Sequence, residues 1–403
     1  MARRFRPCAM ALLPLALPLL ALPFLALPFL APPSPMKDDV DNDSMSRLVR
    51  RVVVAMLLGV ALYGVMVVYR GLAEVGARFA SFAWWSFAAA CGLAFTNYVL
   101  RFLKWEFYLS VLGIRGIPKW ESFLTFLSGF VLTVTPGKVG EVFKSLVLFQ
   151  TRKVAFERSA PIVVAERVTD LIGVIAMIAI GSLGFDGGLP WAIAGAVLVL
   201  VLLIFVASPK LSGPFVAVLP RLPGPLGRFG SLLAPKIETA LVQLRELTTP
   251  TRLIWPTLLS LVGWSLEGVG LWVILKGFQQ DTDLSLAVFF YSTATLAGAL
   301  TPLPGGLGVT DKLLEEQLTR LGGVETAAAT AAMLLIRLAT LWFAVVVGFA
   351  ALGALRARHP GFRMAADGVR GKPPGGEDED APDAPGPTTG PTEPSPSRKP
   401  QDG

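Results

Sequence analysis

The sequence predicts an all-α polytopic membrane protein with about six transmembrane helices and two re-entrant helical hairpins in an inverted repeat. Three observations lead to this fold class. Of the 403 residues, 53% are hydrophobic and only 16% are charged, whereas about a quarter of the residues of a soluble domain are charged. Several uncharged runs are long enough to cross roughly 30 Å of hydrocarbon. Two shorter apolar segments end in the same Thr-Pro and glycine-rich break.

The residue composition also excludes most catalytic chemistry. The chain has only two cysteines, Cys8 and Cys91, and one histidine, His359. These are too few for a His/Cys metal site, a Ser-His-Asp triad or a disulfide framework. No GxxxxGK[ST] phosphate-binding motif occurs. We therefore expect neither a cofactor nor a metal site.

Residues 1–46 form a proline-rich apolar leader, for which two interpretations stay open. Its arginines before an apolar run resemble a signal peptide, but Pro14, Pro18, Pro23 and Pro28 interrupt the run every four or five residues, so a regular helix is not expected there. Alternatively, the start is mis-assigned and translation begins at Met36 or Met45. We assign the leader no function.

The membrane domain is predicted over residues 47–355. Six of its apolar stretches have the length of transmembrane helices. They lie at 52–68, 82–100, 161–183, 191–207, 253–275 and 328–355. Two shorter stretches, 123–134 and 286–300, each run into a Thr-Pro, and this pattern favours re-entrant helices over full spans.

The distribution of Lys and Arg predicts the orientation. Placing the N-terminus in the cytoplasm puts most basic residues of the short loops inside, together with the loop at 208–252, whose second part we expect to be an interfacial helix. Residues 356–403 are predicted to be a disordered cytoplasmic tail, because they are rich in Pro, Gly and acidic residues and have no apolar period. These features predict a multi-pass protein of the bacterial inner membrane with both termini in the cytoplasm.

An internal repeat relates the segments 82–183 and 253–355. Both contain a short apolar helix, a Thr-Pro, a glycine-rich break and then an acidic residue on a second helix. Pro136 and Pro302 are 166 residues apart, and Arg167 and Arg337 on the following span are 170 apart. Three predicted crossings separate the two breaks, so the second copy is inverted relative to the first, as in many transporters. A chance similarity of two Pro-Gly breaks is the alternative.

The two breaks and the charges that follow them form the candidate substrate site. Backbone that leaves the helix inside a bilayer is tolerated only when it is buried in protein or lines a wet cavity, and the start of the next half-helix favours an anion. The candidate residues are Thr135, Pro136, Gly137, Lys138, Gly140, Glu141, Glu166, Arg167, Asp170, Thr301, Pro302, Pro304, Gly305, Gly306, Gly308, Asp311 and Arg337. We expect Glu141 and Asp311 to hold the two arginines or to bind an amine of the headgroup.

A purely structural interpretation of these residues is also open. The glycines could serve only close helix packing. The charges, which include Arg101, Lys104, Glu106 and Glu267 outside the candidate site, could be salt bridges between helices, since an isolated charge at the centre of a membrane helix costs about 2.5–3.5 kcal/mol.

Four segments resemble a known family. TPGKVGEVFKS, AERVTDLIG, PLPGGLGVTD and LLIRLATLW look like the signature segments of the transmembrane region of lysylphosphatidylglycerol synthases and their stand-alone flippase-like relatives. The resemblance covers about residues 47–355. The family usually has Arg at the positions of Lys138 and Lys144 and Glu at that of Asp311. Lys keeps the charge but cannot grip a phosphate with the two-pronged geometry of Arg.

The resemblance implies the function. In the full synthases this region is regarded as a lipid flippase, and a soluble C-terminal domain aminoacylates the lipid. After residue 355 this chain has only the acidic tail, so we expect no enzymatic activity, but flippase-like or scramblase-like movement of a phospholipid or other lipid with an anionic headgroup. The alternative is a non-transporting membrane subunit that presents lipid to a separately encoded lipid-modifying or glycosyl transferase. A membrane-embedded transferase is the third interpretation, and only the carboxylates could serve it. We expect no nucleic-acid partner.

Overall fold

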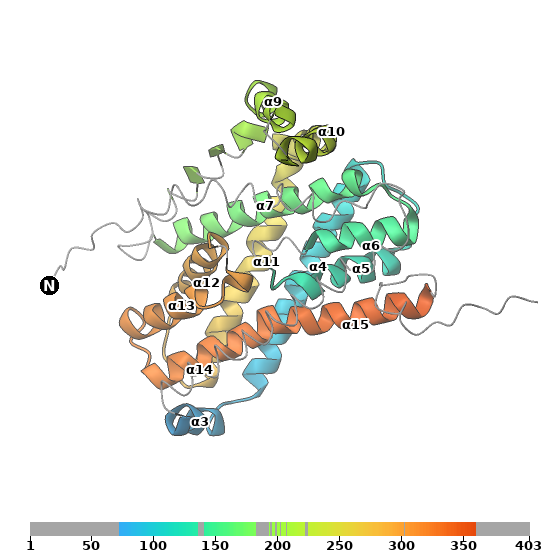
Figure 1. Ribbon diagram of the computed structural model, residues 1–403. Helices are drawn as coiled ribbons and strands as arrows, with labels where there is room; N and C mark the ends of the chain where they lie inside the picture. The colour runs from blue at the N-terminus through green and yellow to red at the C-terminus, as the bar shows by residue number, and fades with distance from the viewer. Residues whose placement is uncertain are drawn as a thin grey trace, which may run out of the picture. The chain divides into compact units, whose positions relative to one another are not determined.

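Two long apolar helices, α4 (Trp85–Val111) and α11 (Pro250–Gly277), lie side by side and antiparallel (Figure 1). The computed structural model describes residues 72–135, 141–182, 193, 196–197, 200–201, 203–206, 208–221, 225–301 and 303–359. All of them belong to one unit, residues 1–366. These residues are in helices and connecting turns, and none of them is in a strand.

The remaining elements follow in chain order. They are α3 (Leu72–Ala80), α5 (Lys119–Ser128), η2 (Gly129–Leu132), α6 (Phe143–Arg152), α7 (Phe156–Ser182), α9 (Pro209–Val218), η4 (Leu219–Arg221), α10 (Pro225–Leu247), α12 (Leu284–Ala299), η5 (Pro304–Gly306), α13 (Val309–Arg320), α14 (Thr326–Arg337), the π-helical turn η6 (Leu338–Trp342) and α15 (Phe343–Arg358).

Three stretches of the described chain have the length and composition of membrane spans. They are α4, α11 and the continuous helical stretch Thr326–Arg358, and these candidate spans coincide with the apolar stretches predicted at 82–100, 253–275 and 328–355. The span predicted at 161–183 is part of helix α7, but Glu166, Arg167 and Asp170 make that helix more polar than the other three. The predicted span at 52–68 lies outside the described residues, and that at 191–207 is described only in part.

Glycines bring the long helices into close contact. A Cβ at Gly263 of α11 would overlap the side-chain oxygen of Asn97 on α4, and one at Gly277 would lie 2.6 Å from the ring of Phe82. A Cβ at Gly173 of α7 would lie 3.0 Å from the backbone of α11. The small residues let the backbones approach, as is common between membrane helices, and they bring the polar side chains of α4, α7 and α11 together.

The first predicted re-entrant segment forms one arm of a helical hairpin. The arm consists of α5 and η2, and it packs against α6 (Figure 1). Near the tip, a Cβ at Gly129 would lie 3.3 Å from Cβ of Lys144. At the open end, Arg152 Nε donates to Glu121 Oε1 at 2.9 Å, and His359 Nε2 lies 3.0 Å from the same oxygen. Burial raises the pKa of Glu121, but Arg152 and His359 outweigh burial and hold that pKa below its ordinary value.

The second short segment also forms a hairpin, in which α12 packs against α13. At its tip, a Cβ at Gly298 would overlap Oγ1 of Thr310. Farther along, Gln317 Nε2 donates to Thr293 Oγ1 at 2.8 Å. Each half of the predicted repeat therefore contains a hairpin, and the tip of the second one lies at its glycine-rich break.

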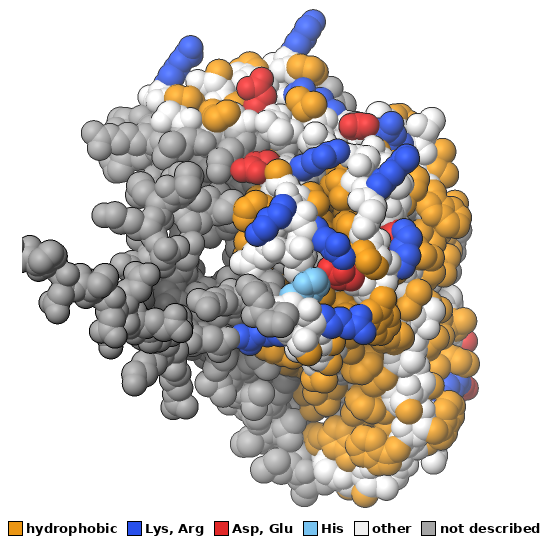
Figure 2. Space-filling view, turned by 90° about the vertical axis from the view of Figure 1, so that its right-hand side faces the viewer, with side chains coloured by type: hydrophobic (Ala, Val, Ile, Leu, Met, Phe, Trp, Pro, Cys, Tyr) orange, Lys and Arg blue, Asp and Glu red, His pale blue; other side chains and the backbone are white. Residues whose placement is uncertain are grey.

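The surface separates apolar and basic regions. Figure 2 shows Lys and Arg gathered around a histidine over the upper part of one face, while apolar side chains cover its lower part. The contacts of Arg152 and His359 with Glu121, and of Arg358 with the ring of Trp120, bring the basic end of α15 to the open end of the first hairpin. Large apolar side chains of the long helices are exposed, among them Ile254, Leu258 and Val346.

Candidate functional site

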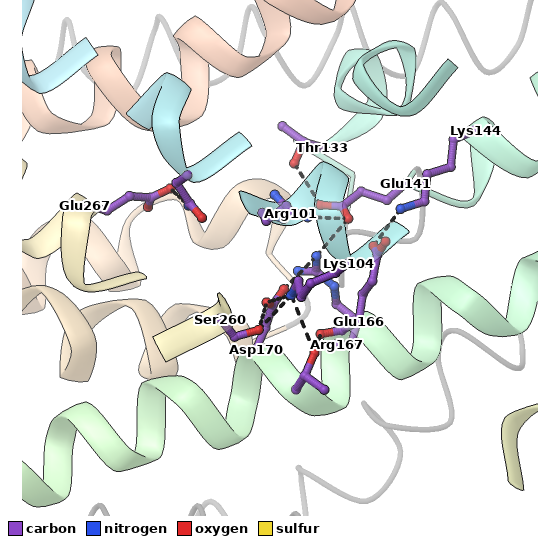
Figure 3. Close-up of polar contacts among 12 residues, drawn as sticks. Arg101, Lys104, Thr133, Glu141, Lys144, Glu166, Arg167, Asp170, Ser260 and Glu267 are labelled. Atoms are coloured by element: carbon purple, nitrogen blue, oxygen red, sulfur yellow. Dashed lines mark hydrogen bonds and ion pairs between the residues drawn. The ribbon is translucent and has the colours of Figure 1, made fainter. Parts of the chain in front are cut away.

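The first break places Glu141 between two arginines. Glu141 follows the Thr133–Thr135 turn at the end of η2 and is only 1% exposed. Its Oε2 accepts hydrogen bonds from Arg101 of α4 and from Arg167 of α7, both at 2.8 Å (Figure 3). Thr133 Oγ1 lies 3.5 Å from the other carboxylate oxygen. Three separate elements therefore converge on one buried carboxylate.

Asp170 forms a second junction one turn along α7. Lys104 of α4 donates to Asp170 Oδ1 at 2.5 Å, and Ser260 of α11 donates to the same atom at 2.9 Å. Arg167 lies 3.0 Å from Oδ2 of Asp170. Arg167 thus bridges both carboxylates, and the network connects α4, α7 and α11 with Glu141, which lies just before α6 (Figure 3).

Lys144 and Glu166 form a separate buried pair. Lys144 of α6 donates to Glu166 Oε2 at 2.6 Å, and its Nζ lies 4.6 Å from the ring centroid of Trp105 and 4.9 Å from that of Phe126. Both partners are at most 1% exposed. This buried ion pair links α6 to α7, in agreement with the structural interpretation of its charges.

The second break binds Arg337. The chain turns through left-handed conformations at Gly305 (φ 60°), Gly306 (φ 66°) and Gly308 (φ 85°), which glycine adopts without strain. Arg337 donates to the carbonyl of Gly305 at 2.6 Å, and its Nε lies 2.8 Å from Oδ1 of Asp311. The other oxygen of Asp311 accepts from the amide of Gly308 at 2.8 Å. Asp311 therefore both closes the start of α13 and holds the arginine.

Glu267 lies on the opposite side of the network from α6 (Figure 3). Asn97 Nδ2 donates to its Oε1 at 2.6 Å, and the hydroxyl of Tyr291 donates to its Oε2. Glu267 is 6% exposed. Both of these donors are neutral, whereas Glu141 and Asp170 each also accept hydrogen bonds from Lys or Arg.

A cavity of about 180 Å³ is lined by Thr133 and Thr135 on one side and by Gly305 and Gly306 of the second break on the other. Its described polar lining consists of Tyr98, Arg101, Thr133, Thr135, Arg167, Asp170, Trp264, Glu267, Tyr291, Thr295, Thr301, Thr310, Arg337 and Thr340. Three arginines and two carboxylates thus face one space, which leaves a formal excess of one positive charge. Among the described residues, no group of His, Cys, Asp and Glu side chains is arranged to hold a metal ion.

The structure brings seven of the predicted site residues together at the cavity. They are Thr135, Arg167, Asp170, Thr301, Gly305, Gly306 and Arg337. Glu141 pairs with Arg167 and Asp311 with Arg337, and both acids lie behind the lining. Glu166, Pro304 and Gly308 do not line the cavity. Pro136, Gly137, Lys138, Gly140 and Pro302 lie outside the described residues.

The candidate site omitted several polar residues of α4 and α11 that line the cavity. Arg101 and Glu267 were recognised as charges that need partners but were not assigned to the site. A spacing signal could have found the α4 face: Asn97, Arg101 and Lys104 are four and three residues apart, which places them on one side of a helix. Ser260 and Glu267 are seven apart, again two helical turns.

Comparison with known proteins places the chain in a family. The family described as lysylphosphatidylglycerol synthase TM region matches residues 52–348, well over half of the chain. The chain belongs to this family. It is also 25% identical over 228 residues to a UPF0104 membrane protein of Methanocaldococcus jannaschii, which covers 54% of this chain and 91% of that protein. A UPF0104 membrane protein of Methanothermobacter thermautotrophicus is 24% identical over 284 residues, with 64% of this chain and 82% of the relative covered.

Proposed function

We propose that this family member moves a phospholipid, or another amphiphilic lipid with an anionic headgroup, between the two leaflets of the bacterial inner membrane. The observation that carries the proposal is the cavity at which Arg101, Arg167 and Arg337 meet. Arginines that face an enclosed space make charge-assisted hydrogen bonds to a phosphate. The headgroup would enter this cavity, and the acyl chains would stay in the surrounding lipid.

The two hairpins suit a transport route. Polar residues inside a membrane protein line substrate pathways, and substrates of many transporters bind where broken helices meet near the midplane. We propose that both hairpins are re-entrant, that they enter from opposite sides, and that six helices span the membrane in an inverted repeat. The basic end shown in Figure 2 would face the cytoplasm.

We further propose that the chain itself performs no covalent chemistry. The carboxylates Glu141, Asp170 and Asp311 are bound by cations, so a general acid or base is not ready among them. A separately encoded lipid-modifying or glycosyl transferase would then supply or consume the lipid.

The experiment is a leaflet-accessibility assay. Proteoliposomes containing fluorescent phosphatidylglycerol are treated with an impermeant quencher, and the rate at which protected lipid becomes accessible is measured. We expect this rate to be higher with wild-type protein than in protein-free vesicles. Arg337→Gln should lower the rate by about tenfold, which corresponds to the loss of one charge-assisted hydrogen bond.

Two companion variants separate binding from folding. Arg337→Gln together with Asp311→Asn removes both charges and so leaves no stranded carboxylate. Lys276→Gln removes one partner of the exposed Lys276–Asp281 pair and serves as the control. A double variant that is folded and moves lipid at the wild-type rate would overturn the role of Arg337. Lipid binding without any movement in wild type would favour a lipid-presenting subunit.

A further inference from the structure

Glu267 differs from the other buried acids around the cavity in its partners. Glu141, Glu166, Asp170 and Asp311 each have at least one Lys or Arg nitrogen within 3.0 Å. Glu267 forms no ion pair within the described part of the chain, and its hydrogen bonds come from the amide of Asn97 and the hydroxyl of Tyr291. A carboxylate that is 6% exposed and lacks a counterion bears its charge without the compensation that a cation gives to the other acids.

The groups around Glu267 come from four elements. Cys91, Tyr98 and Arg101 lie on α4, Arg167 and Asp170 on α7, Tyr291 on α12, and Arg337 on α14. Arg101 and Glu267 both act electrostatically on Tyr98, and Arg337 and Glu267 both act on Tyr291. The arginines are therefore close enough to influence Glu267 but are bound to other acids.

A hydrogen-bond chain allows Glu267 to hold a proton. Tyr291 donates to Glu267, and the side chain of Thr340 in the π-helical turn lies close enough to interact with the same hydroxyl. A tyrosine hydroxyl donates one hydrogen bond and also accepts. When Glu267 is protonated, its new O–H can donate to Tyr291, and the hydroxyl of Tyr291 can turn to Thr340. Protonation then leaves no buried donor without an acceptor.

We propose that Glu267 takes up one proton when an anionic headgroup enters the cavity and releases it when the headgroup leaves, so that lipid and proton cross together. The proposal rests on the proposed lipid transport. A phosphate placed beside the three arginines adds a negative charge to a cavity wall that already contains Asp170 and Glu267. Like charges in a poorly solvated site raise the affinity for a proton. The proton comes from water on the side of entry, forms an O–H bond at Glu267, and returns to water on the other side.

The first test measures proton uptake directly. Purified full-length protein in detergent is titrated with inorganic phosphate between pH 5 and 9 in buffers of different ionisation enthalpy, which gives the number of protons bound per phosphate. Phosphate itself titrates in this range, so the proton count is compared between variants. We expect wild type to take up close to one proton more than Glu267→Gln at some pH in this range, because the amide of the variant resembles the protonated acid.

Two further variants serve as controls for this test. Tyr291→Phe removes the hydrogen bond that the Tyr291 hydroxyl donates to the Glu267 carboxylate, which favours the charged form, so uptake should move to higher pH. Glu315→Gln changes another buried acid, which is bonded to Thr330 away from the cavity lining, and should leave uptake as in wild type. Equal uptake in wild type and Glu267→Gln would overturn the assignment, as would phosphate binding that depends on sodium and not on pH.

The second test uses vesicles with labelled phosphatidylglycerol and an imposed pH difference. For one proton per lipid, a difference of one pH unit supports about a tenfold lipid asymmetry at steady state. Glu267→Gln should produce no lipid asymmetry. Movement without asymmetry in wild type would overturn the coupling and keep the proposed function. If no lipid moves, lipid transport and co-transport both fail, while the phosphate titration still reports whether anion and proton binding are coupled.

Discussion

At the scale of single residues, the described membrane part binds its buried cations with carboxylates from other helices. Lys104, Lys144 and Arg101 are each at most 5% exposed and have an acid within 2.8 Å. Removing one partner of a buried pair leaves the other charge without compensation and costs about 3–5 kcal/mol, whereas replacing both by apolar residues is often neutral.

The buried Lys144–Glu166 pair provides the clearest test of this difference between removing one partner and replacing both. We expect Lys144→Met to lower the free energy of unfolding by about 3–5 kcal/mol, because it strands Glu166. Adding Glu166→Leu should restore most of the loss. Thermal or denaturant unfolding in one detergent gives both values, and Lys276→Gln at the exposed pair should change stability by less than about 1 kcal/mol. A double variant as unstable as the single one would contradict the explanation.

Pairs within one half of the repeat could be predicted from the sequence, but junctions between distant helices could not. Glu141 with Arg167 and Asp311 with Arg337 follow from the order break, acid, next helix. Arg101 also binds Glu141, and Lys104 binds Asp170, because α4 lies beside α7 and α11. Nothing local in the sequence of α4 specifies that neighbour. The same charges ended the predicted span at residue 100, although the helix continues to Val111.

At the scale of elements, the two hairpins depend on how closely their arms meet. In the second hairpin Gly298 on α12 faces Gly306 and Thr310 across the tip, and a Cβ at Gly306 would lie 3.0 Å from Cα of Gly298. Gly306 also has a left-handed backbone. The cavity wall formed by Gly298, Gly305 and Gly306 therefore requires both small size and unusual backbone geometry.

Alanine substitutions should distinguish these positions from ordinary helical glycines. Gly306→Ala incurs about 1–2 kcal/mol for the left-handed conformation alone, so we expect lower stability and slower lipid movement. Gly298→Ala should act similarly through overlap with Thr310. Gly92 of α4 has nothing within 4 Å of its would-be Cβ, and Gly92→Ala should be neutral or slightly stabilising. Unfolding midpoints and the leaflet-accessibility assay are measured for the three variants. Equal stability and equal lipid movement in all three would contradict the requirement for glycine at the hairpin tip.

At the scale of the whole molecule, aromatic side chains mark two levels along the long helices. Trp84 and Trp85 at the start of α4 are 57% and 66% exposed, and Trp120 and Trp255 near its other end are 54% and 52% exposed. Tryptophan concentrates at the two membrane interfaces. Because α4 and α11 are antiparallel, Asp281 lies beyond the level of Trp84 and Trp85, and Lys119 lies near the level of Trp120 and Trp255.

Thiol labelling tests the proposed orientation. In a background without Cys8 and Cys91, we expect Asp281→Cys to react with an impermeant reagent in intact cells, because its side chain is fully exposed on the proposed outer side. Lys119→Cys, 81% exposed as the native side chain, and Arg221→Cys should react only after permeabilisation. Labelling of Lys119→Cys in intact cells would reverse the orientation.

The π-helical turn after Arg337 determines the directions in which the side chains of the last helix, α15, point. Eight residues of regular α-helix rotate about 80° beyond two full turns, so Leu338 and Val346 would point in different directions. A π turn accommodates one additional residue, which returns them to nearly the same azimuth, and both are exposed, at 44% and 65%. The outer apolar stripe therefore stays continuous past the point where Arg337 and Thr340 face inward. Losing one residue from this turn would rotate α15 by about 100° about its own axis and carry its outward stripe into the protein.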